Sequence, residues 1–138
     1  QLNDHNLLLK EKYARMKRED VRYEAYNMGG DYQALIVSYG TMSRVCRTAI
    51  DSLKGEGLDI AMIRPQTLFP FPEAAVREAA SKESCKVAVS IEMSMGQMVE
   101  DVERSVQGRC PVKWYGKCGG EVPTPEEVMD VVREMIKA

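Results

Sequence analysis

Catalysis by a nucleophile or by an acid–base pair needs a base held next to the reacting group, and this sequence offers few such bases. Its one histidine, His5, lies in a polar N-terminal segment that we expect to be mobile. A lone histidine also cannot build the usual histidine-rich zinc site. The sequence therefore disfavours a free-standing hydrolase, and no catalytic residue is predicted.

The cysteine spacing fits neither a zinc site nor an iron–sulfur cluster. Cys46, Cys85, Cys110 and Cys118 are separated by 39, 25 and 8 residues, with no C-x-x-C pair. The sequence shows no secretory signal, and its composition can supply a core without disulfides. We expect buried, reduced thiols in a cytoplasmic protein and no metal bound by this chain.

Residues 92–98 read Glu-Met-Ser-Met-Gly-Gln-Met, which places a carboxylate and three methionines beside a turn glycine. A carboxylate at the end of a buried strand either accepts amide hydrogens from the following helix or meets a partner. Methionine is flexible and polarisable, so the cluster suits an adaptable protein–protein surface, although Met95 and Met98 suit a core equally well. Both alternatives stay open at this point.

Two further loops contain residues that could bind an anion or another protein chain. Gly40, Thr41 and Ser43 stand at an expected helix start, where backbone amides and hydroxyls form a generic anion cradle or an ordinary capped turn. Residues 64–72 combine prolines with Phe69 and Phe71 in a stiff apolar loop. That loop either folds over its own sheet or presses against another chain.

The elements that position these loops alternate along the chain. Strands are predicted at residues 21–27, 34–37, 58–63, 86–91 and 112–115, and helices at 41–54, 72–81, 96–107 and from 124 onward. Residues 34–37 form a continuous apolar run, typical of a strand covered on both faces. Strands that alternate with crossover helices predict a mostly parallel sheet in a three-layer α/β/α sandwich.

Length and composition limit the possible classes of protein. The 138 residues fit one domain, and we predict an N-terminal arm helix or linker over residues 1–20 and an α/β domain over 21–138. Hydrophobic residues make up 44% and charged residues 29%, which indicates a soluble globular chain without a membrane span. The net charge of −2 argues against nucleic acid or anionic lipid as a partner.

Three segments together resemble the carboxyl-terminal region of the alpha subunit of 2-oxoacid:ferredoxin oxidoreductases. They are residues 37–43 (VSYGTMS), residues 63–72 with their Ile-Arg-Pro and Leu-Phe-Pro-Phe-Pro pieces, and residues 92–98 (EMSMGQM). The resemblance covers nearly the whole chain, and residues 92–98 are its most specific part. Transketolase and 2-oxoacid dehydrogenase beta subunits carry a similar domain, but their loop after the glutamate is typically glycine-rich, whereas methionines and Gln97 follow here.

The resemblance implies a transketolase C-terminal-like domain with a five-stranded sheet whose first strand is an antiparallel edge strand. In such complexes thiamine diphosphate, with magnesium, lies between a pyrimidine-type domain upstream in the alpha subunit and a diphosphate-binding domain of a beta subunit. Iron–sulfur clusters belong to a ferredoxin-like subunit or domain. The complex that is resembled decarboxylates a 2-oxoacid oxidatively to an acyl-coenzyme A and passes electrons to ferredoxin.

The resulting hypothesis is a non-catalytic assembly domain that binds no cofactor alone and works within an oligomeric complex of the ketoisovalerate, 2-oxoglutarate or pyruvate type. The predicted subunit contact consists of residues from the two apolar loops: Glu92, Met93, Ser94, Gly96, Gln97, Met98, Phe69 and Phe71. The alternative is a regulatory module that binds a nucleotide or coenzyme A at Gly40, Thr41 and Ser43.

Overall fold

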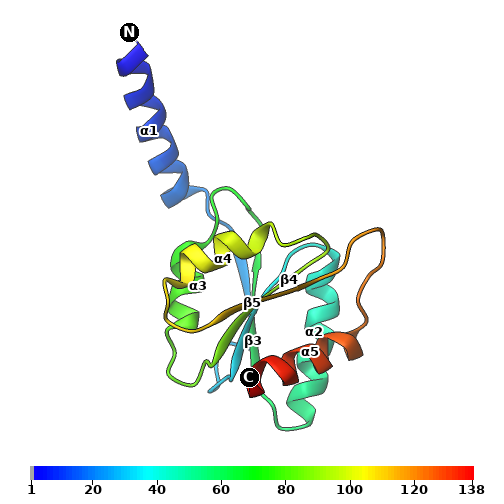
Figure 1. Cartoon of the computed structure of the whole chain (residues 1–138). Helices are drawn as coiled ribbons and strands as arrows, with labels where there is room; N and C mark the ends of the chain where they lie inside the picture. Colours follow the sequence, from blue (N-terminus) through cyan, green and yellow to red (C-terminus); the bar gives the residue numbers. More distant parts are fainter. Residues whose placement is uncertain (1) are drawn as a thin grey trace.

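The computed structural model describes residues 2–138, and a five-stranded sheet lies at the centre of this part of the chain (Figure 1). The strands are β1 (Tyr23–Tyr26), β2 (Ala34–Val37), β3 (Ile60–Pro65), β4 (Val87–Glu92) and β5 (Val112–Gly116). Their spatial order is β1-β3-β2-β4-β5. Only the β1–β3 pairing is antiparallel, which confirms the predicted antiparallel edge strand.

Four helices cover the two faces of the sheet, and a fifth projects from it. The helices are α1 (Leu2–Glu19), α2 (Thr41–Gly55), α3 (Glu73–Ala80), α4 (Met98–Val106) and α5 (Pro125–Lys137). Helices α3 and α4 lie on one face, while α2 and α5 lie on the other (Figure 1). The predicted three-layer sandwich is confirmed.

Each central strand contributes alternate side chains to two separate apolar clusters, because successive side chains of a strand point to opposite faces. In β2, Leu35 and Val37 pack with α3 and α4, whereas Ala34 and Ile36 pack with α2 and α5. All four β2 residues are buried, as the continuous apolar run predicts. The sheet is therefore packed on both faces, and the loops at the ends of its strands start from fixed positions.

Two element boundaries differ from the sequence prediction in ways that matter for the site. Strand β3 runs from Ile60 to Pro65 and not from 58 to 63, because its last residue pairs with Tyr23 of the antiparallel β1. Helix α4 begins at Met98 and not at residue 96, because Gly96 has a φ of 94° and still belongs to the loop. A residue with a positive φ cannot be part of a right-handed helix, so the helix begins only after Gly96.

Helix α1 confirms the helical pattern predicted for the N-terminal segment, and it contains no buried residue. Its side chain Tyr13 contacts the ring of Phe69 edge to face, with the ring centroids 5.9 Å apart. Apart from its junction with the domain, the helix points away from the sheet (Figure 1). Among residues 2–138, none of the helices combines the length and the apolar character that crossing a membrane requires.

Candidate functional site

Three loops meet at the edge of the sheet where the parallel strands end. They follow β3 (residues 66–72), β2 (residues 38–40) and β4 (residues 93–97), and β2 lies between β3 and β4 in the sheet. In open α/β sheets this carboxyl edge is where ligands and partners usually bind. The loop segments singled out from the sequence are thus brought together at one edge.

Glu92 is the buried centre of the loop after β4. Its side chain is 1% exposed, and its two carboxylate oxygens accept four hydrogen bonds. Oε1 accepts from the Met98 backbone N–H at 2.6 Å and from the Ser94 hydroxyl at 3.0 Å. Oε2 accepts from the Val99 backbone N–H at 3.1 Å and from the Ser90 hydroxyl at 2.8 Å.

This arrangement gives Glu92 a structural task within the chain. The first backbone N–H groups of a helix have no partner in the helix itself, and a negative charge there is stabilised by the helix dipole. Glu92 supplies both the acceptors and the charge for α4. In this chain the side chain is therefore directed inward as a cap, and it does not offer a surface of its own.

The loop after β4 lies close against Trp114 and Gly116 of β5. A Cβ atom at Gly116 would lie 2.6 Å from the carbonyl oxygen of Glu92 and 2.7 Å from that of Ser94. Gly96, which has a positive φ, lies against the Trp114 ring. A Cβ atom at Gly96 would lie 3.5 Å from two atoms of that ring. The loop therefore has little freedom to move toward the sheet.

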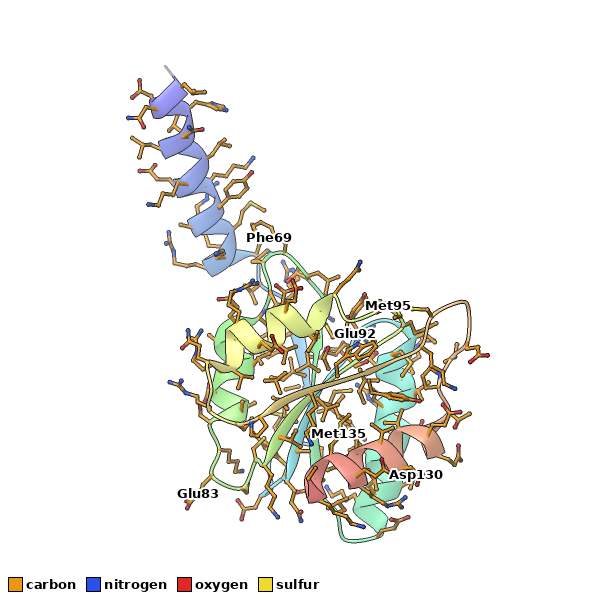
Figure 2. The ribbon with its side chains drawn as sticks, viewed as in Figure 1. Phe69, Glu83, Glu92, Met95, Asp130 and Met135 are labelled. Atoms are coloured by element: carbon orange, nitrogen blue, oxygen red, sulfur yellow. The ribbon has the colours of Figure 1, made fainter. Side chains whose placement is uncertain are left out.

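Above this framework, the loops expose apolar side chains. Met93 is 40% exposed and Met95 78%, while Leu68 is 47% and Phe69 59% exposed in the loop after β3. Figure 2 shows Phe69 and Met95 at the same end of the sheet as Glu92. We call these four residues, Leu68, Phe69, Met93 and Met95, the apolar edge.

The predicted contact residues thus separate into an inner and an outer set. Met98 is 4% exposed and Phe71 7%, and both pack into the cluster formed with α3 and α4. Of the two methionines for which surface and core were left open, Met98 belongs to the core and Met95 to the surface. Gln97 is exposed, and Ser94 and Gly96 are half-buried.

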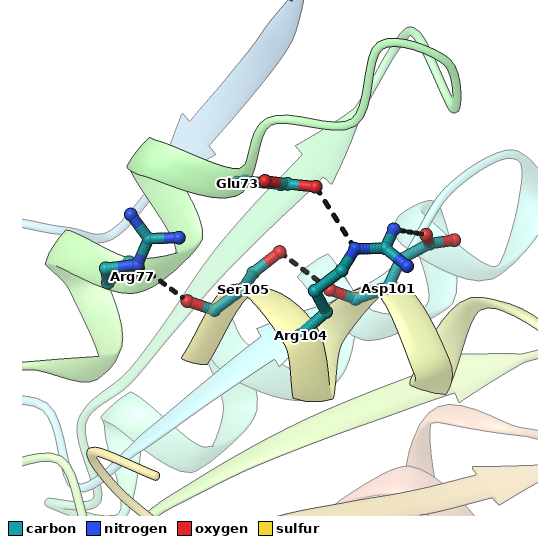
Figure 3. Close-up of polar contacts among 5 residues, drawn as sticks. All are labelled: Glu73, Arg77, Asp101, Arg104 and Ser105. Carbon is teal, nitrogen blue, oxygen red and sulfur yellow. Dashed lines mark hydrogen bonds and ion pairs between the residues drawn. The ribbon is translucent and has the colours of Figure 1, made fainter. Parts of the chain in front are cut away.

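A groove of about 910 Å³ opens next to Phe69, between the end of α1 and helices α3 and α4. Arg104 of α4 lies on its wall and donates to Glu73 of α3, with Nε 3.2 Å from Oε1, and to Asp101 (Figure 3). Arg77 Nε donates to the Ser105 carbonyl oxygen at 3.1 Å. The contacts of Arg104 with Glu73 and of Arg77 with Ser105 join α3 to α4. The Glu73 and Asp101 carboxylates raise the pKa of the Arg104 guanidinium.

The helix start after β2 has fewer free donors than its sequence indicates. The Ser43 hydroxyl donates to the Gly40 carbonyl oxygen at 2.6 Å, and the Ser43 backbone N–H donates to the same oxygen at 3.1 Å. Ser43 is also 2% exposed, whereas Thr41 is exposed. Two donors of the predicted anion cradle are thus used within the turn itself.

The cysteines of residues 2–138 are not gathered in the way that an iron–sulfur cluster requires. Such clusters are held by sets of cysteine thiolates, usually four. Among residues 2–138, no three His, Cys, Asp or Glu side chains come together as a possible metal site. His5 lies on α1 and is more than 30 residues before the first loop of the carboxyl edge in the sequence.

Sequence reasoning missed two residues that shape this edge, Trp114 and Arg104, whereas it included Gly116 among the residues that follow a predicted strand. Gly116 and Trp114 become important because β5 pairs with β4, Glu92 opposite Gly116. Arg104 matters through its contact with another helix. The predicted end of a strand at residue 115 and the glycines of residues 116–120 were the sequence signals that pointed to this region.

Comparison with known proteins identifies the family. Residues 33–128 match the model of the pyruvate:ferredoxin oxidoreductase core domain II. The chain is 39% identical over 135 residues to ketoisovalerate oxidoreductase subunit VorB of Methanothermobacter thermautotrophicus, which covers 98% of this chain and 37% of that protein. It is 36% identical over 105 residues to 2-oxoglutarate synthase subunit KorA of Methanothermobacter marburgensis, covering 76% and 28% respectively.

Solved structures show the same fold. A 2-oxoglutarate:ferredoxin oxidoreductase from Magnetococcus marinus, with 2-oxoglutarate, coenzyme A and succinyl-CoA bound, superimposes with a TM-score of 0.78 at 24% identity, covering 99% of this chain and 24% of that one. An inactive β4 tetramer of a split-gene transketolase gives a TM-score of 0.65 at 18% identity, covering 83% and 41%. The chain spans 37% of the length of the VorB relative. From the family match and the identity to its relatives, the chain belongs to the pyruvate:ferredoxin oxidoreductase core domain II family.

Proposed function

We propose that this chain is a non-catalytic assembly domain of a 2-oxoacid:ferredoxin oxidoreductase, and that its apolar edge contacts another part of the complex. The observation that carries the proposal is the contrast between Glu92 and the residues around it. A fully buried carboxylate with four hydrogen bonds fixes a loop whose Met93 and Met95 side chains are left exposed. A protein without a partner gains little by holding apolar side chains in water.

The chemistry of the proposed complex is supplied elsewhere. In this proposal the complex decarboxylates a 2-oxoacid oxidatively to an acyl-coenzyme A with electrons passing to ferredoxin. Thiamine diphosphate with magnesium would lie between an upstream pyrimidine-type domain and a beta subunit, and iron–sulfur clusters in a ferredoxin-like subunit. The chain would contribute binding surface, because its described residues bring together no nucleophile, base and orienting group.

Loop geometry favours adaptable packing as the mode of contact. Methionine side chains have three rotatable bonds and a polarisable sulfur, so they adjust to a partner's surface. Phe69 adds a rigid ring, of the kind that dominates the energetics of interfaces. The edge therefore combines a rigid anchor with flexible neighbours above a fixed loop backbone.

The test is capture of the tagged chain's partners from an anaerobic lysate of its native host, with mass-spectrometric identification. We expect a thiamine-diphosphate-binding subunit and a ferredoxin-like subunit to be recovered. The double variant Met93→Asp/Met95→Asp should reduce their recovery at least about tenfold, because an interface would have to desolvate both new charges.

A matched control adds the same net charge at the opposite edge of the sheet. Ser52→Asp/Lys86→Gln also lowers the net charge by two, and both positions are exposed. We expect this control to capture both subunits at the level of the unmodified chain. Equal recovery with the Met93→Asp/Met95→Asp variant would refute the apolar edge as the contact, and capture of unrelated proteins alone would refute the assignment to the complex.

A further inference from the structure

Two cysteines meet at the opposite edge of the sheet, where strands β4 and β5 begin. Cys85 precedes β4 by two positions and Cys110 precedes β5 by two positions. The strands are adjacent and parallel, with Ala88 paired to Val112, and the Ala88 N–H donates to the Pro111 carbonyl oxygen at 2.9 Å. This register brings the two cysteines together although 25 residues separate them in the chain.

The two side chains lie close enough to act on each other. Both pack into the same apolar cluster, Cys85 as a buried member and Cys110 as a partly buried side chain against it. The Cys85 sulfur also lies 3.6 Å from the Val87 carbonyl oxygen, to which it donates. Both residues are free thiols, so no covalent bond joins them in this state.

Their surroundings differ in a way that suits two successive chemical roles. Cys85 is 6% exposed, whereas Cys110 is only partly buried and can be reached from solvent. The interaction between the two side chains lowers the pKa of the Cys110 thiol, and the same interaction together with burial raises the pKa of Cys85. The thiolate is the nucleophile toward an oxidant, so Cys110, which is the more accessible of the two and has the lower pKa, is the sulfur that reacts first.

The other cysteines lack this combination. Cys46 is a fully buried residue of α2, and burial raises its pKa to about 12. Cys118 is exposed, but it follows β5 and so lies at the opposite end of that strand from Cys110. A basic residue adjoins each member of the pair in sequence, Lys86 after Cys85 and Arg109 before Cys110.

We propose that Cys85 and Cys110 form an oxidative modification site, at which a hydroperoxide converts the two thiols reversibly into a disulfide. The Cys110 thiolate attacks the outer peroxide oxygen, the O–O bond breaks, and the alcohol or water leaves after taking up a proton, which gives a sulfenic acid. The Cys85 sulfur then attacks the sulfenic sulfur and water leaves. Two electrons pass from the thiols to the peroxide, and a dithiol reductant returns them.

The disulfide would join the segments entering β4 and β5 at the edge away from the apolar edge. The proposal therefore does not depend on the proposed assembly function. Its readout is a covalent bond within the chain, whatever complex the chain enters.

The test begins with the reduced, purified chain, freed of reductant under argon and exposed to one to ten equivalents of hydrogen peroxide. Free thiols are counted, and remaining thiols are alkylated before digestion with trypsin without reduction. Each cysteine falls in its own tryptic peptide, with Cys85 in residues 83–86 and Cys110 in residues 110–113, so a disulfide between them has a unique mass. We expect free thiols to fall from four to two per chain, and dithiothreitol to restore them.

The linked peptides 83–86 and 110–113 should exceed every other disulfide at least tenfold in the folded chain. In the same chain unfolded with guanidinium, the pair Cys110–Cys118 competes, because it closes a loop of only 8 residues. Cys110→Ser and Cys85→Ser should each abolish the product, whereas Cys118→Ser should leave its yield unchanged.

Three results would overturn the proposal. They are sulfinic acid on Cys110 with Cys85 still a free thiol, dominance of another pair in the folded chain, and loss of the product in the Cys118→Ser variant. The unmodified chain alone decides the first two, so the proposal remains testable even if a cysteine variant fails to fold. Circular dichroism of each variant identifies that case.

Discussion

The loop after β4 and the helix α1 both expose apolar side chains, but they are held in very different ways. The loop lies on a buried carboxylate, with Met93 and Met95 exposed above it. Helix α1 exposes Leu7 and Leu8 and has no buried residue at all. Among the described residues, α1 makes one aromatic contact with the domain, the ring pair Tyr13–Phe69.

The difference shows that exposure alone does not define a prepared surface. Around Glu92 the polar groups are buried and satisfied, so the loop keeps its shape before any partner binds, and binding costs less ordering entropy. Helix α1 has an apolar stripe, but none of its described residues is buried, so no packed core fixes its direction. A partner of the loop meets a preformed surface, whereas a partner of α1 must also orient the helix.

Replacing Glu92 should produce the largest change. In Glu92→Gln the amide NH₂ must face either the Met98 N–H or the Val99 N–H, because these donors bind different carboxylate oxygens. One backbone N–H therefore loses its acceptor whichever way the amide turns, and the capping charge is also lost. We expect the free energy of unfolding to fall by about 2–4 kcal/mol, measured by urea denaturation.

Glu100→Gln is the matched control for that variant. Glu100 lies in the same first turn of α4 but is exposed, so it contributes through the helix dipole alone. Its replacement should cost only about 0.3–1 kcal/mol. Similar losses in the two variants would mean that the buried hydrogen bonds do not set the stability of the loop.

Gly116→Ala tests the same loop from the side of β5. The added methyl would lie 2.6 Å from the Glu92 carbonyl oxygen and 2.7 Å from that of Ser94, and both are backbone atoms that cannot turn away. We expect a loss of about 1–3 kcal/mol in the free energy of unfolding, because strand and loop must separate. Thermal or urea unfolding measures it.

Gly55→Ala provides the opposite sign. Gly55 is the last residue of α2, and a Cβ there meets nothing within 4 Å. Alanine in a helix is favoured over glycine by about 0.5–1 kcal/mol, so this variant should be slightly more stable than the unmodified chain. If Gly116→Ala were also neutral or stabilising, the close approach of β5 to the loop would not restrain it.

The sequence predicted the fold well because its signals are local. The apolar run at residues 34–37 and the spacing of Met42, Cys46, Ala49 and Ile50 on α2 predict a covered strand and an amphipathic helix, and the structure has both. The Thr124 hydroxyl accepts from the Glu127 N–H at 3.2 Å and so caps the helix that is predicted from residue 124 onward. These features depend on neighbours within a few residues.

The site was predictable only in part, because its details depend on distant pairs. The choice between cap and contact at Glu92 was decided by the turn of Gly96, which delays α4 until its N–H groups face the carboxylate. Met98 points inward and Met95 outward for the same reason. The proximity of Cys85 and Cys110 follows from the register of β4 and β5, which spacing along the chain does not reveal.

Removing α1 should produce the smallest change in stability. A chain of residues 20–138 loses no buried side chain from α1, and the ring contact Tyr13–Phe69 is worth about 0.5–1.5 kcal/mol at most. We expect the free energy of unfolding of the remaining domain to change by less than about 1.5 kcal/mol, while far-UV circular dichroism loses the signal of an 18-residue helix. Tyr13→Ala in the longer chain should lose as much stability as the truncation does. A truncation that costs more than about 3 kcal/mol while Tyr13→Ala costs almost nothing would show that α1 supports the domain through contacts other than this ring, and the contrast with the loop after β4 would fail.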